Sequence, residues 1–334
     1  MRILVLGGTR FVGRAFVEEA LGAGHELTLF NRGQTNPELF PEVEILHGDR
    51  EKSLEPLTSS GRSWDAVFDP SCYLPRVARM SAEALRDRVP HYSFVSSLSV
   101  YDDLSTLGQD EGGHLATIAD PSTEEITDGS YGGLKVLAER EVEAVYGDRA
   151  LILRPGYICG PYDSLGRMPF WLERLSRGGE VLAPEGPDSP VQLIDARDIA
   201  RFALALAARG EGGVFNLCAP QVPYRLGDLL ETAARVTGQA DVTPIWASAD
   251  FLVEHGLDGW EAFPWWVPPK EFAFSRFDAS RALAAGLTIT PIEASLRDCW
   301  AWMSSLPEPP LREDRGLSPE REAELLERWH ARSR

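Results

Sequence analysis

The sequence predicts an α/β fold in which helices cover both faces of a parallel sheet, followed by a smaller C-terminal lobe. Two observations lead to this prediction. In the first half of the chain, short apolar runs alternate with amphipathic segments, as in right-handed strand–helix–strand units. In addition, a glycine-rich turn joins the first apolar run to the first amphipathic segment, with the sequence Gly7-Gly8-Thr9-Arg10-Phe11-Val12-Gly13.

The predicted strands are short and rich in Val, Ile, Leu and Phe, as buried parallel strands are. They cover residues 3–6, 26–30, 44–47, 66–68, 92–95 and 150–153, with further strands at 191–194 and 214–217. The amphipathic pattern predicts helices at residues 12–23, 78–88, 134–145 and 199–208. An exposed, charged helix is predicted at 318–330, where Ser318 precedes Pro319 and Glu320 as an N-cap.

Composition restricts the class of protein. The chain has 334 residues, of which 43% are hydrophobic and 25% charged, which is ordinary for a globular protein. Its formal net charge of -18 argues against general nucleic-acid binding. The four cysteines and six histidines are scattered, so we expect neither a disulfide framework nor a metal site. Without a signal-peptide core or a long apolar stretch, we expect a cytoplasmic protein that does not enter membranes.

The glycine turn predicts a dinucleotide site of the Rossmann type. Such a turn needs small residues for tightness, for close approach of the backbone to a pyrophosphate, and for helix–sheet contact. Gly7 and Gly13 meet the first and third needs, whereas the expected middle glycine is replaced by Arg10. We expect the cofactor to contact Gly7, Thr9, Arg10, Phe11, Val12 and Gly13.

The second strand favours NADP(H) over NAD(H). In NAD-binding folds this strand ends in an acid that binds the adenosine ribose. Here it ends in Asn31 and Arg32, and a guanidinium there or at Arg10 suits a 2′-phosphate. The alternative is that Arg32 is a solvated turn residue. Asp49, after the third strand, is a candidate for the adenine amino group or a simple turn residue.

From this we predict three parts of the chain. Residues 1–160 form the dinucleotide-binding domain, completed by about 190–220. Residues 161–189 and 221–312 form a substrate lobe, and 313–334 form a helical tail.

A catalytic group is predicted from Tyr131, Lys135 and a serine. Residues i and i+4 share a helix face, so the phenol and the ammonium face the same space, and the ammonium lowers the pKa of the tyrosine. Ser97 follows the strand at 92–95, whose carboxyl end faces the cofactor in a parallel sheet. Serines at strand ends are also common turn residues.

Together these segments resemble the extended branch of the short-chain dehydrogenase/reductase superfamily, which includes epimerases, dehydratases and carbonyl reductases. The segments are the glycine turn, 96–101, Tyr131-xxx-Lys135, 153–161 and 192–200. The resemblance implies that Tyr131 is the general acid/base and that Lys135 binds the nicotinamide ribose. It also implies that Ser97 is the catalytic hydroxyl and that the segment around Pro155 passes beneath the nicotinamide.

Two departures from the family pattern refine this interpretation. Dehydratases of this branch carry an Asp-Glu pair directly after the catalytic hydroxyl residue, where this chain has Leu98 and Ser99. The glycine turn resembles an atypical subgroup that includes chloroplast stem-loop RNA-binding proteins.

These observations predict an NADP(H)-dependent oxidoreductase acting on a carbonyl or alcohol of a small molecule. The alternatives are a nucleotide-sugar epimerase with retained NAD(P) and a non-catalytic cofactor-sensing or RNA-binding protein. The aromatic cluster Phe263-Pro264-Trp265-Trp266, with Trp260 before it and Trp171 as a second candidate, suits a substrate surface, a lobe core or a homodimer contact.

Overall fold

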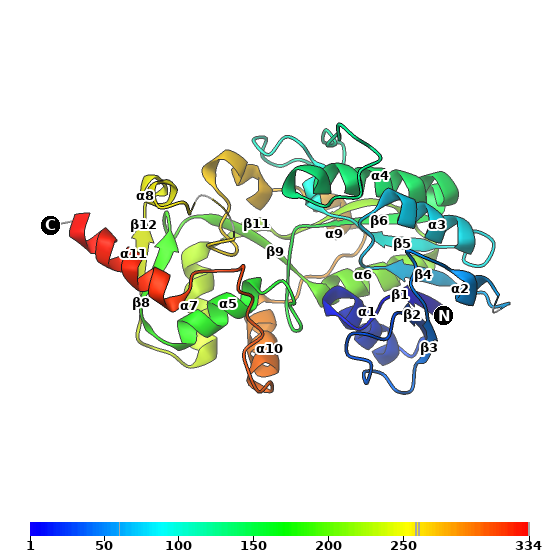
Figure 1. Cartoon of the computed structure of the whole chain (residues 1–334), viewed down its shortest axis with the longest axis horizontal. Coiled ribbons are helices and arrows are strands. Elements are labelled where there is room, and N and C mark those ends of the chain that lie inside the picture. Colours follow the sequence, from blue (N-terminus) through cyan, green and yellow to red (C-terminus); the bar gives the residue numbers. More distant parts are fainter. Residues whose placement is uncertain (60, 258, 260, 333–334) are drawn as a thin grey trace.

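The computed structural model describes residues 1–59, 61–257, 259 and 261–332. The molecule is elongated (Figure 1). The N-terminal half surrounds a large sheet at one end, and most of the residues after 157 form a smaller group of helices and strands at the other.

Seven parallel strands form the large sheet, in the order β10-β6-β5-β4-β1-β2-β3. They are β1 (Arg2–Leu6), β2 (Glu26–Asn31), β3 (Glu44–His47), β4 (Ala66–Asp69), β5 (Tyr92–Val95), β6 (Ala150–Pro155) and β10 (Gly213–Leu217). All residues of β4, β5 and β6 are buried, which explains why these strands read as continuous apolar runs. The strand order reverses at β1, and ligands bind at such a switch point in doubly wound sheets.

Helices cover both faces of this sheet, which confirms the predicted doubly wound Rossmann-type fold. On one face, α1 (Phe11–Gly22) packs against α6 (Ala196–Arg209). On the other face, α3 (Pro75–Leu85) packs against α4 (Asp128–Tyr146), with the short α2 (Glu55–Thr58) beside them. The glycine turn therefore leads from the central strand directly into a covering helix.

The C-terminal lobe has two small sheets and a hydrophobic core of its own. One sheet contains β7 (Tyr157–Cys159), β9 (Pro190–Asp195) and β11 (Ala219–Arg225), and the other pairs β8 (Gly179–Pro184) with β12 (Val242–Ala247). Its helices are α5 (Arg167–Ser176), α7 (Leu226–Thr237), α8 (Ala249–Glu254), α10 (Ile292–Ser304) and α11 (Pro319–Arg332). Four short helices complete the described elements: η1 (Leu98–Val100), η2 (Gly147–Arg149), η3 (Pro269–Ser275) and α9 (Ser280–Ala284).

The chain passes between the large sheet and the lobe several times. The strand predicted at 191–194 belongs to the lobe, because β9 pairs with β7 and β11, whereas the next strand, β10, returns to the large sheet beside β6. Further along, Ala282 and Leu287 pack into the same hydrophobic cluster as α1 and α6. The two parts of the molecule are thus built from interleaved segments.

The aromatic cluster lies in the core of the lobe. Phe263, Trp265 and Trp266 are each no more than 2% exposed, and Trp171 is fully buried beside Trp265, with ring centroids 6.2 Å apart. The cluster therefore stabilises the lobe, and these rings present no surface on which a substrate could stack. Trp260, which the sequence grouped with this cluster, lies outside the described residues.

The tail helix was predicted to be exposed, and this is wrong for one of its faces. Leu325 and Glu322 of α11 are buried, and Glu322 forms an ion pair with Arg174 of α5. The capping prediction holds, because the hydroxyl of Ser318 accepts a hydrogen bond from the backbone N–H of Arg321 at 3.2 Å. Because most side chains of α11 are charged and only Glu322 and Leu325 are buried, the buried face was not visible in the sequence pattern.

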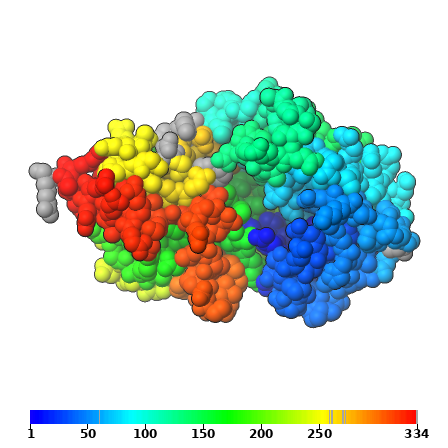
Figure 2. Space-filling view, viewed as in Figure 1, coloured from blue at the N-terminus to red at the C-terminus, as the bar shows by residue number. Residues whose placement is uncertain are grey.

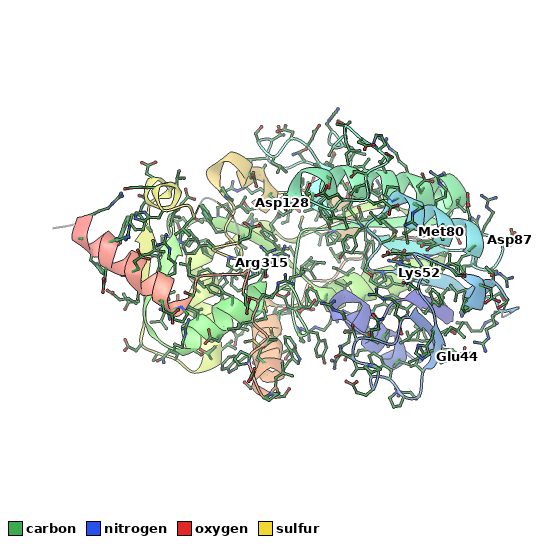
Figure 3. The ribbon with its side chains drawn as sticks, viewed as in Figure 1. Glu44, Lys52, Met80, Asp87, Asp128 and Arg315 are labelled. Atoms are coloured by element: carbon green, nitrogen blue, oxygen red, sulfur yellow. The ribbon has the colours of Figure 1, made fainter. Side chains whose placement is uncertain are left out.

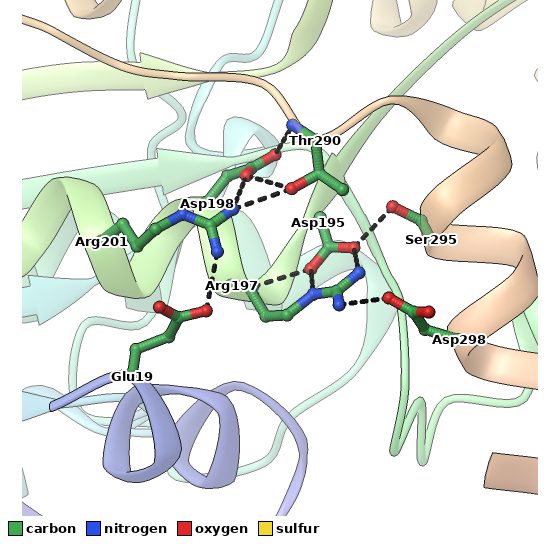
Figure 4. A network of polar contacts seen from close by, with 8 residues as sticks. All are labelled: Glu19, Asp195, Arg197, Asp198, Arg201, Thr290, Ser295 and Asp298. Atoms are coloured by element: carbon green, nitrogen blue, oxygen red, sulfur yellow. Dashed lines mark hydrogen bonds and ion pairs between the residues drawn. The ribbon is translucent and has the colours of Figure 1, made fainter. Parts of the chain in front are cut away.

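A polar network connects the start of α6 to the lobe (Figure 4). Asp195 caps α6, accepts hydrogen bonds from Arg197, and accepts one from the hydroxyl of Ser295 in α10 at 2.5 Å. The Arg197 guanidinium reaches Asp298 of α10 at 2.5 Å. A second arginine, Arg201, pairs with Glu19 of α1 at 2.6 Å. These contacts fix α10 of the lobe to the helices that cover the sheet.

Candidate active site

The glycine turn has the backbone that a dinucleotide site requires. Gly7 and Gly8 have φ of +126° and +103°, a region that favours glycine. A Cβ at Gly13 would lie 3.1 Å from the backbone nitrogen of Gly8, so the residue must be small for α1 to start this close to the turn. The requirement for glycine at position 8 was not predicted, although the sequence shows a second glycine directly after the first.

Arg10 replaces the expected middle glycine without backbone strain. Its φ of -134° and ψ of 143° are extended values that any residue adopts, and its side chain is exposed. The next residues, Phe11 and Val12, are buried in the core beneath the turn. Their backbone N–H groups belong to the first turn of α1, where a helix lacks internal hydrogen-bond acceptors and attracts phosphate.

Asn31 braces the glycine turn. Its amide donates to the carbonyl oxygen of Gly7 at 3.2 Å, and its side-chain oxygen accepts from the N–H of Gly33 at 2.9 Å. A second amide, that of Asn36, donates to the carbonyl oxygen of Thr9 at 2.8 Å, a contact that the sequence did not predict. The side chain at position 31 therefore has a structural task as well as the place of the expected acid.

Two charges flank the end of β2. The side chain of Arg32 is exposed, and its charge acts on Asp49 in the following loop. Asp49 accepts a hydrogen bond from the N–H of Glu51 at 3.1 Å and pairs with Lys52 at 3.4 Å. These contacts lower the pKa of the Asp49 carboxyl, the backbone hydrogen bond most of all.

The structure brings the predicted serine and tyrosine together. Ser97 follows β5 and caps the short helix η1, and Tyr131 lies in the first turn of α4. The Ser97 hydroxyl is close enough to the phenol of Tyr131 to lower its pKa. Ser97 also donates to the hydroxyl of Ser99 at 3.1 Å and accepts from the Ser99 N–H at 3.1 Å, which fixes its orientation.

Two glycines allow this close approach. A Cβ at Gly132 would collide with the carbonyl oxygen of Ser99, and one at Gly133 would lie 2.9 Å from Cβ of Ile118. The helix also begins earlier than the predicted residue 134, because Thr127 forms a capping box with Ser130. The Tyr131–Lys135 spacing already placed the tyrosine at the start of a helix, and the two glycines weaken the helical signal of this first turn.

Lys135 lies one turn later and is fully buried. Its ammonium donates to the carbonyl oxygens of Cys72 and Val95, both at 2.7 Å. Burial lowers the pKa of Lys135 to about 8, while the nearby charge of Asp69 opposes this decrease. Asp69, itself buried at the end of β4, is held by Arg50 at 2.6 Å and by the Tyr92 hydroxyl at 2.9 Å.

The pKa of Tyr131 corrects a sequence prediction. It is raised above the usual value, not lowered, because burial disfavours the phenolate. The Ser97 hydroxyl opposes the increase, and so does the positive charge of Arg167 from α5 of the lobe, whereas Tyr73 adds to it.

Two further residues lie where central strands end. Pro155 ends β6, is buried, and pairs in register with Leu217 of β10. Ser96, directly after β5, is 5% exposed, and its hydroxyl has no hydrogen-bond partner among the described residues. Buried polar groups in proteins are normally hydrogen-bonded. The unpaired hydroxyl of Ser96, at the same edge of the sheet as the glycine turn, therefore indicates a place where a polar ligand can bind.

Charged and aromatic side chains of the lobe gather around Tyr157. The guanidinium carbon of Arg167 lies 4.9 Å from the ring centroid of Tyr157, and Arg315 pairs with Glu261 at 3.6 Å. Figure 3 shows Arg315 between the two parts of the molecule, where Figure 2 shows a hollowed surface. The sequence did not single out either arginine, because both lie in irregular segments or at a helix start.

Comparison with known proteins relates one part of the chain to a family. The model of the NAD dependent epimerase/dehydratase family matches residues 76–218, which include Ser97, Tyr131 and Lys135. Over this segment, which is less than half of the chain, the sequence is similar to that family.

The curated relatives of the chain are distant. A 2′-dehydrokanamycin reductase of Streptomyces kanamyceticus is 28% identical over 76% of this chain and 74% of its own length. A UDP-glucose 4-epimerase of Corynebacterium glutamicum is 24% identical over 73% and 84%. The chloroplast stem-loop binding protein of 41 kDa b of Arabidopsis thaliana is 25% identical over 65% of this chain, and the match spans only 58% of that protein.

Solved structures of similar fold include epimerases. A UDP-N-acetylglucosamine 4-epimerase from Methanobrevibacter ruminantium, in complex with UDP-N-acetylmuramic acid, has a TM-score of 0.69 at 16% identity, covering 91% of this chain and 98% of its own. A UDP-glucuronic acid 4-epimerase from Bacillus cereus in complex with NAD has a TM-score of 0.65 at 14% identity, covering 91% and 99%. At these identities the likeness shows the fold alone.

The described residues lack two kinds of feature, a membrane-spanning helix and a cluster of metal ligands. In residues 1–59, 61–257, 259 and 261–332, every helix is too short or too polar to cross a membrane. The same part of the chain holds no group of three or more His, Cys, Asp and Glu side chains arranged to bind a metal ion.

Proposed function

We propose that the chain is an NADP(H)-dependent oxidoreductase that interconverts a carbonyl and an alcohol on a small molecule. The observation that carries the proposal is the placement of Ser97 directly after β5 and of Tyr131 in the first turn of α4, where the serine hydroxyl acts on the phenol. The nicotinamide supplies or accepts the hydride. In reduction, Ser97 orients the substrate oxygen and Tyr131 donates a proton to it, and in oxidation the phenolate accepts that proton.

The preference for NADP(H) rests on Arg10 and Arg32. Both side chains are exposed near the mouth of the glycine turn and the end of β2. Position 31 offers an amide, which is already engaged with the turn, in place of a carboxylate that would repel a 2′-phosphate. We propose that the two guanidinium groups bind that phosphate and that Lys135 binds the nicotinamide ribose.

The substrate that we propose is polar and rich in hydroxyl groups. Arg167, Arg315 and Glu261 supply hydrogen-bond donors and acceptors around Tyr157, and the charge of Arg167 also acts on Tyr131. The name of the Streptomyces relative, a 2′-dehydrokanamycin reductase, supports reduction of a ketone on a carbohydrate-like molecule. The alternative, epimerisation of a nucleotide sugar, is supported by the Corynebacterium relative.

A ketone panel tests the proposal. The full-length protein is incubated with NADPH and a set of keto-sugars and keto-aminocyclitols, and NADPH oxidation is followed at 340 nm. We expect substrate-dependent oxidation, and loss of about 100-fold or more in Tyr131→Phe, because general acid catalysis contributes about 10²–10⁴-fold. Turnover that is unchanged in Tyr131→Phe would contradict the mechanism.

The same preparation separates the alternatives. An epimerase with retained cofactor would show cofactor absorbance in the purified protein and would convert nucleotide sugars without net NADPH oxidation. A protein that only binds would bind cofactor and show no substrate-dependent oxidation with any member of the panel.

A further inference from the structure

A buried ion pair joins helix α4 to strand β6. The guanidinium of Arg154, in β6, donates to the two carboxylate oxygens of Glu139, in α4, at 3.0 and 2.7 Å. The two residues are only 3% and 2% exposed, so the pair is shielded from water. Because separating a buried pair leaves an uncompensated charge in the core, this contact holds α4 firmly against β6.

The same guanidinium also reaches the end of η1. Its Nη1 atom donates to the hydroxyl oxygen of Tyr101, the residue that ends η1, at 2.9 Å. That hydroxyl in turn donates to the side-chain oxygen of Asn216, in β10, at 2.8 Å. Burial raises the pKa of Tyr101, so the hydroxyl keeps the proton that it donates. Arg154 is thus bonded both to α4 and to the segment that follows β5.

The short helix η1 connects this network to Ser97. Ser97 begins η1, where its hydroxyl accepts from the N–H of Ser99 at 3.1 Å, and Tyr101 ends it. Only three residues separate the two ends, so a shift of Tyr101 is passed on to Ser97. The carbonyl oxygen of Ser99 also lies against Gly132 in the first turn of α4, where a Cβ would collide with it.

One arginine therefore contacts the supports of both parts of the proposed site. Through Tyr101 it holds the turn that carries Ser97, and through Glu139 it holds the helix that carries Tyr131. We propose that Arg154 is a positioning residue, which fixes Ser97 and Tyr131 relative to each other from within the core. The proposal rests on the proposed function, since it gives Arg154 a role only through these two residues.

Tyr101→Phe tests the proposal with a small change. It keeps the ring and removes only the hydroxyl that Arg154 and Asn216 share. With a ketone that the panel identifies, we expect kcat to fall by about 10–100-fold, because a misplacement of about 1 Å can cost about 100-fold. The KM values for NADPH and for the ketone should stay within about twofold, as when an interaction is lost only in the transition state.

A matched control and a second variant make the result specific. Tyr146→Phe removes another buried hydroxyl, one without a hydrogen-bond partner among the described residues, and should leave kcat unchanged. Arg154→Lys keeps a positive charge beside Glu139 but lacks the fork that bonds to both partners. Its kcat should fall as in Tyr101→Phe, and the double variant should lose no more than either single variant, because the two changes break one link. Unchanged kcat in Tyr101→Phe, a change confined to KM, or additive losses would overturn the proposal.

A second readout does not need turnover. Hydrogen-exchange mass spectrometry of the full chain follows residues 97–101 in each variant. We expect faster exchange there in Tyr101→Phe and Arg154→Lys but not in Tyr146→Phe, with β1 protected in all of them. If exchange changes in this way while the ketone panel gives no activity, the proposed function fails and the link through Arg154 stands. Unchanged exchange over residues 97–101 in Tyr101→Phe would overturn the link itself.

Discussion

At the scale of single residues, backbone conformation explains which departures from a motif matter. Arg10 stands where a glycine was expected, and its extended backbone shows why a side chain is tolerated there. The positive φ values of the turn fall instead on Gly7, Gly8 and, at +31°, Phe11. The position of the turn could be predicted from the sequence, whereas the role of each glycine in it became clear only from the backbone dihedral angles.

Cofactor preference is decided at this scale. Arg32→Gln and Arg10→Gln should each weaken NADPH binding by about 10–100-fold, the value of a charge-assisted hydrogen bond or two, and should leave NADH binding nearly unchanged. Titration calorimetry with both cofactors measures this. Arg86→Gln, an exposed arginine at the end of α3, serves as the control. A wild-type chain that binds NADH more tightly than NADPH would reject the preference.

At the scale of elements, strands were predicted better than helix starts. The strands at 44–47 and 92–95 coincide with β3 and β5, because short apolar runs bounded by polar residues define them. The helix α4 begins at Asp128, earlier than the amphipathic pattern indicated, because Gly132 and Gly133 weaken the helical signal while they allow η1 to lie beside Tyr131. Local propensity and tertiary contact point in opposite directions there.

The buried face of α11 gives a stability prediction. Glu322→Ala leaves Arg174 buried without its carboxylate and should destabilise the protein by about 3–5 kcal/mol. Leu325→Ala should cost about 2–5 kcal/mol through lost burial. Urea unfolding measures both changes. Glu327→Ala, on the exposed face, should stay within about 0.5 kcal/mol, and equal effects at 322 and 327 would contradict the buried face.

At the scale of the whole molecule, the fold class followed from periodicity, but the arrangement of lobe and sheet did not. The contacts that join them come from residues far apart in sequence, whether polar, as between Arg197 and Asp298, or apolar, as where Ala282 and Leu287 pack with α1 and α6. The charge of Arg167 in α5 acts on Tyr131 only because the lobe lies against the sheet. Residue patterns within one segment carry no information about such pairings.

The network of Figure 4 should control how firmly the lobe is held. Arg197→Ala removes the link between Asp195 and Asp298, so backbone amides of α10 should exchange hydrogen faster while those of β1 stay protected. Hydrogen-exchange mass spectrometry of the full chain measures this. Arg209→Ala, an exposed arginine at the end of α6 that pairs with Glu211, should change neither region. Equal exchange in α10 of both variants would show that other contacts hold the lobe.

The interleaving of the two parts has a consequence for synthesis. The edge strand β10 pairs with β6, yet the ribosome makes the lobe segments α5, β8 and β9 between them. A nascent chain that has just completed β6 therefore exposes the backbone edge of that strand until residues 213–217 emerge. Unpaired strand edges promote aggregation during folding. For this protein, the interval between residues 155 and 217 is when a growing chain most needs protection by chaperones.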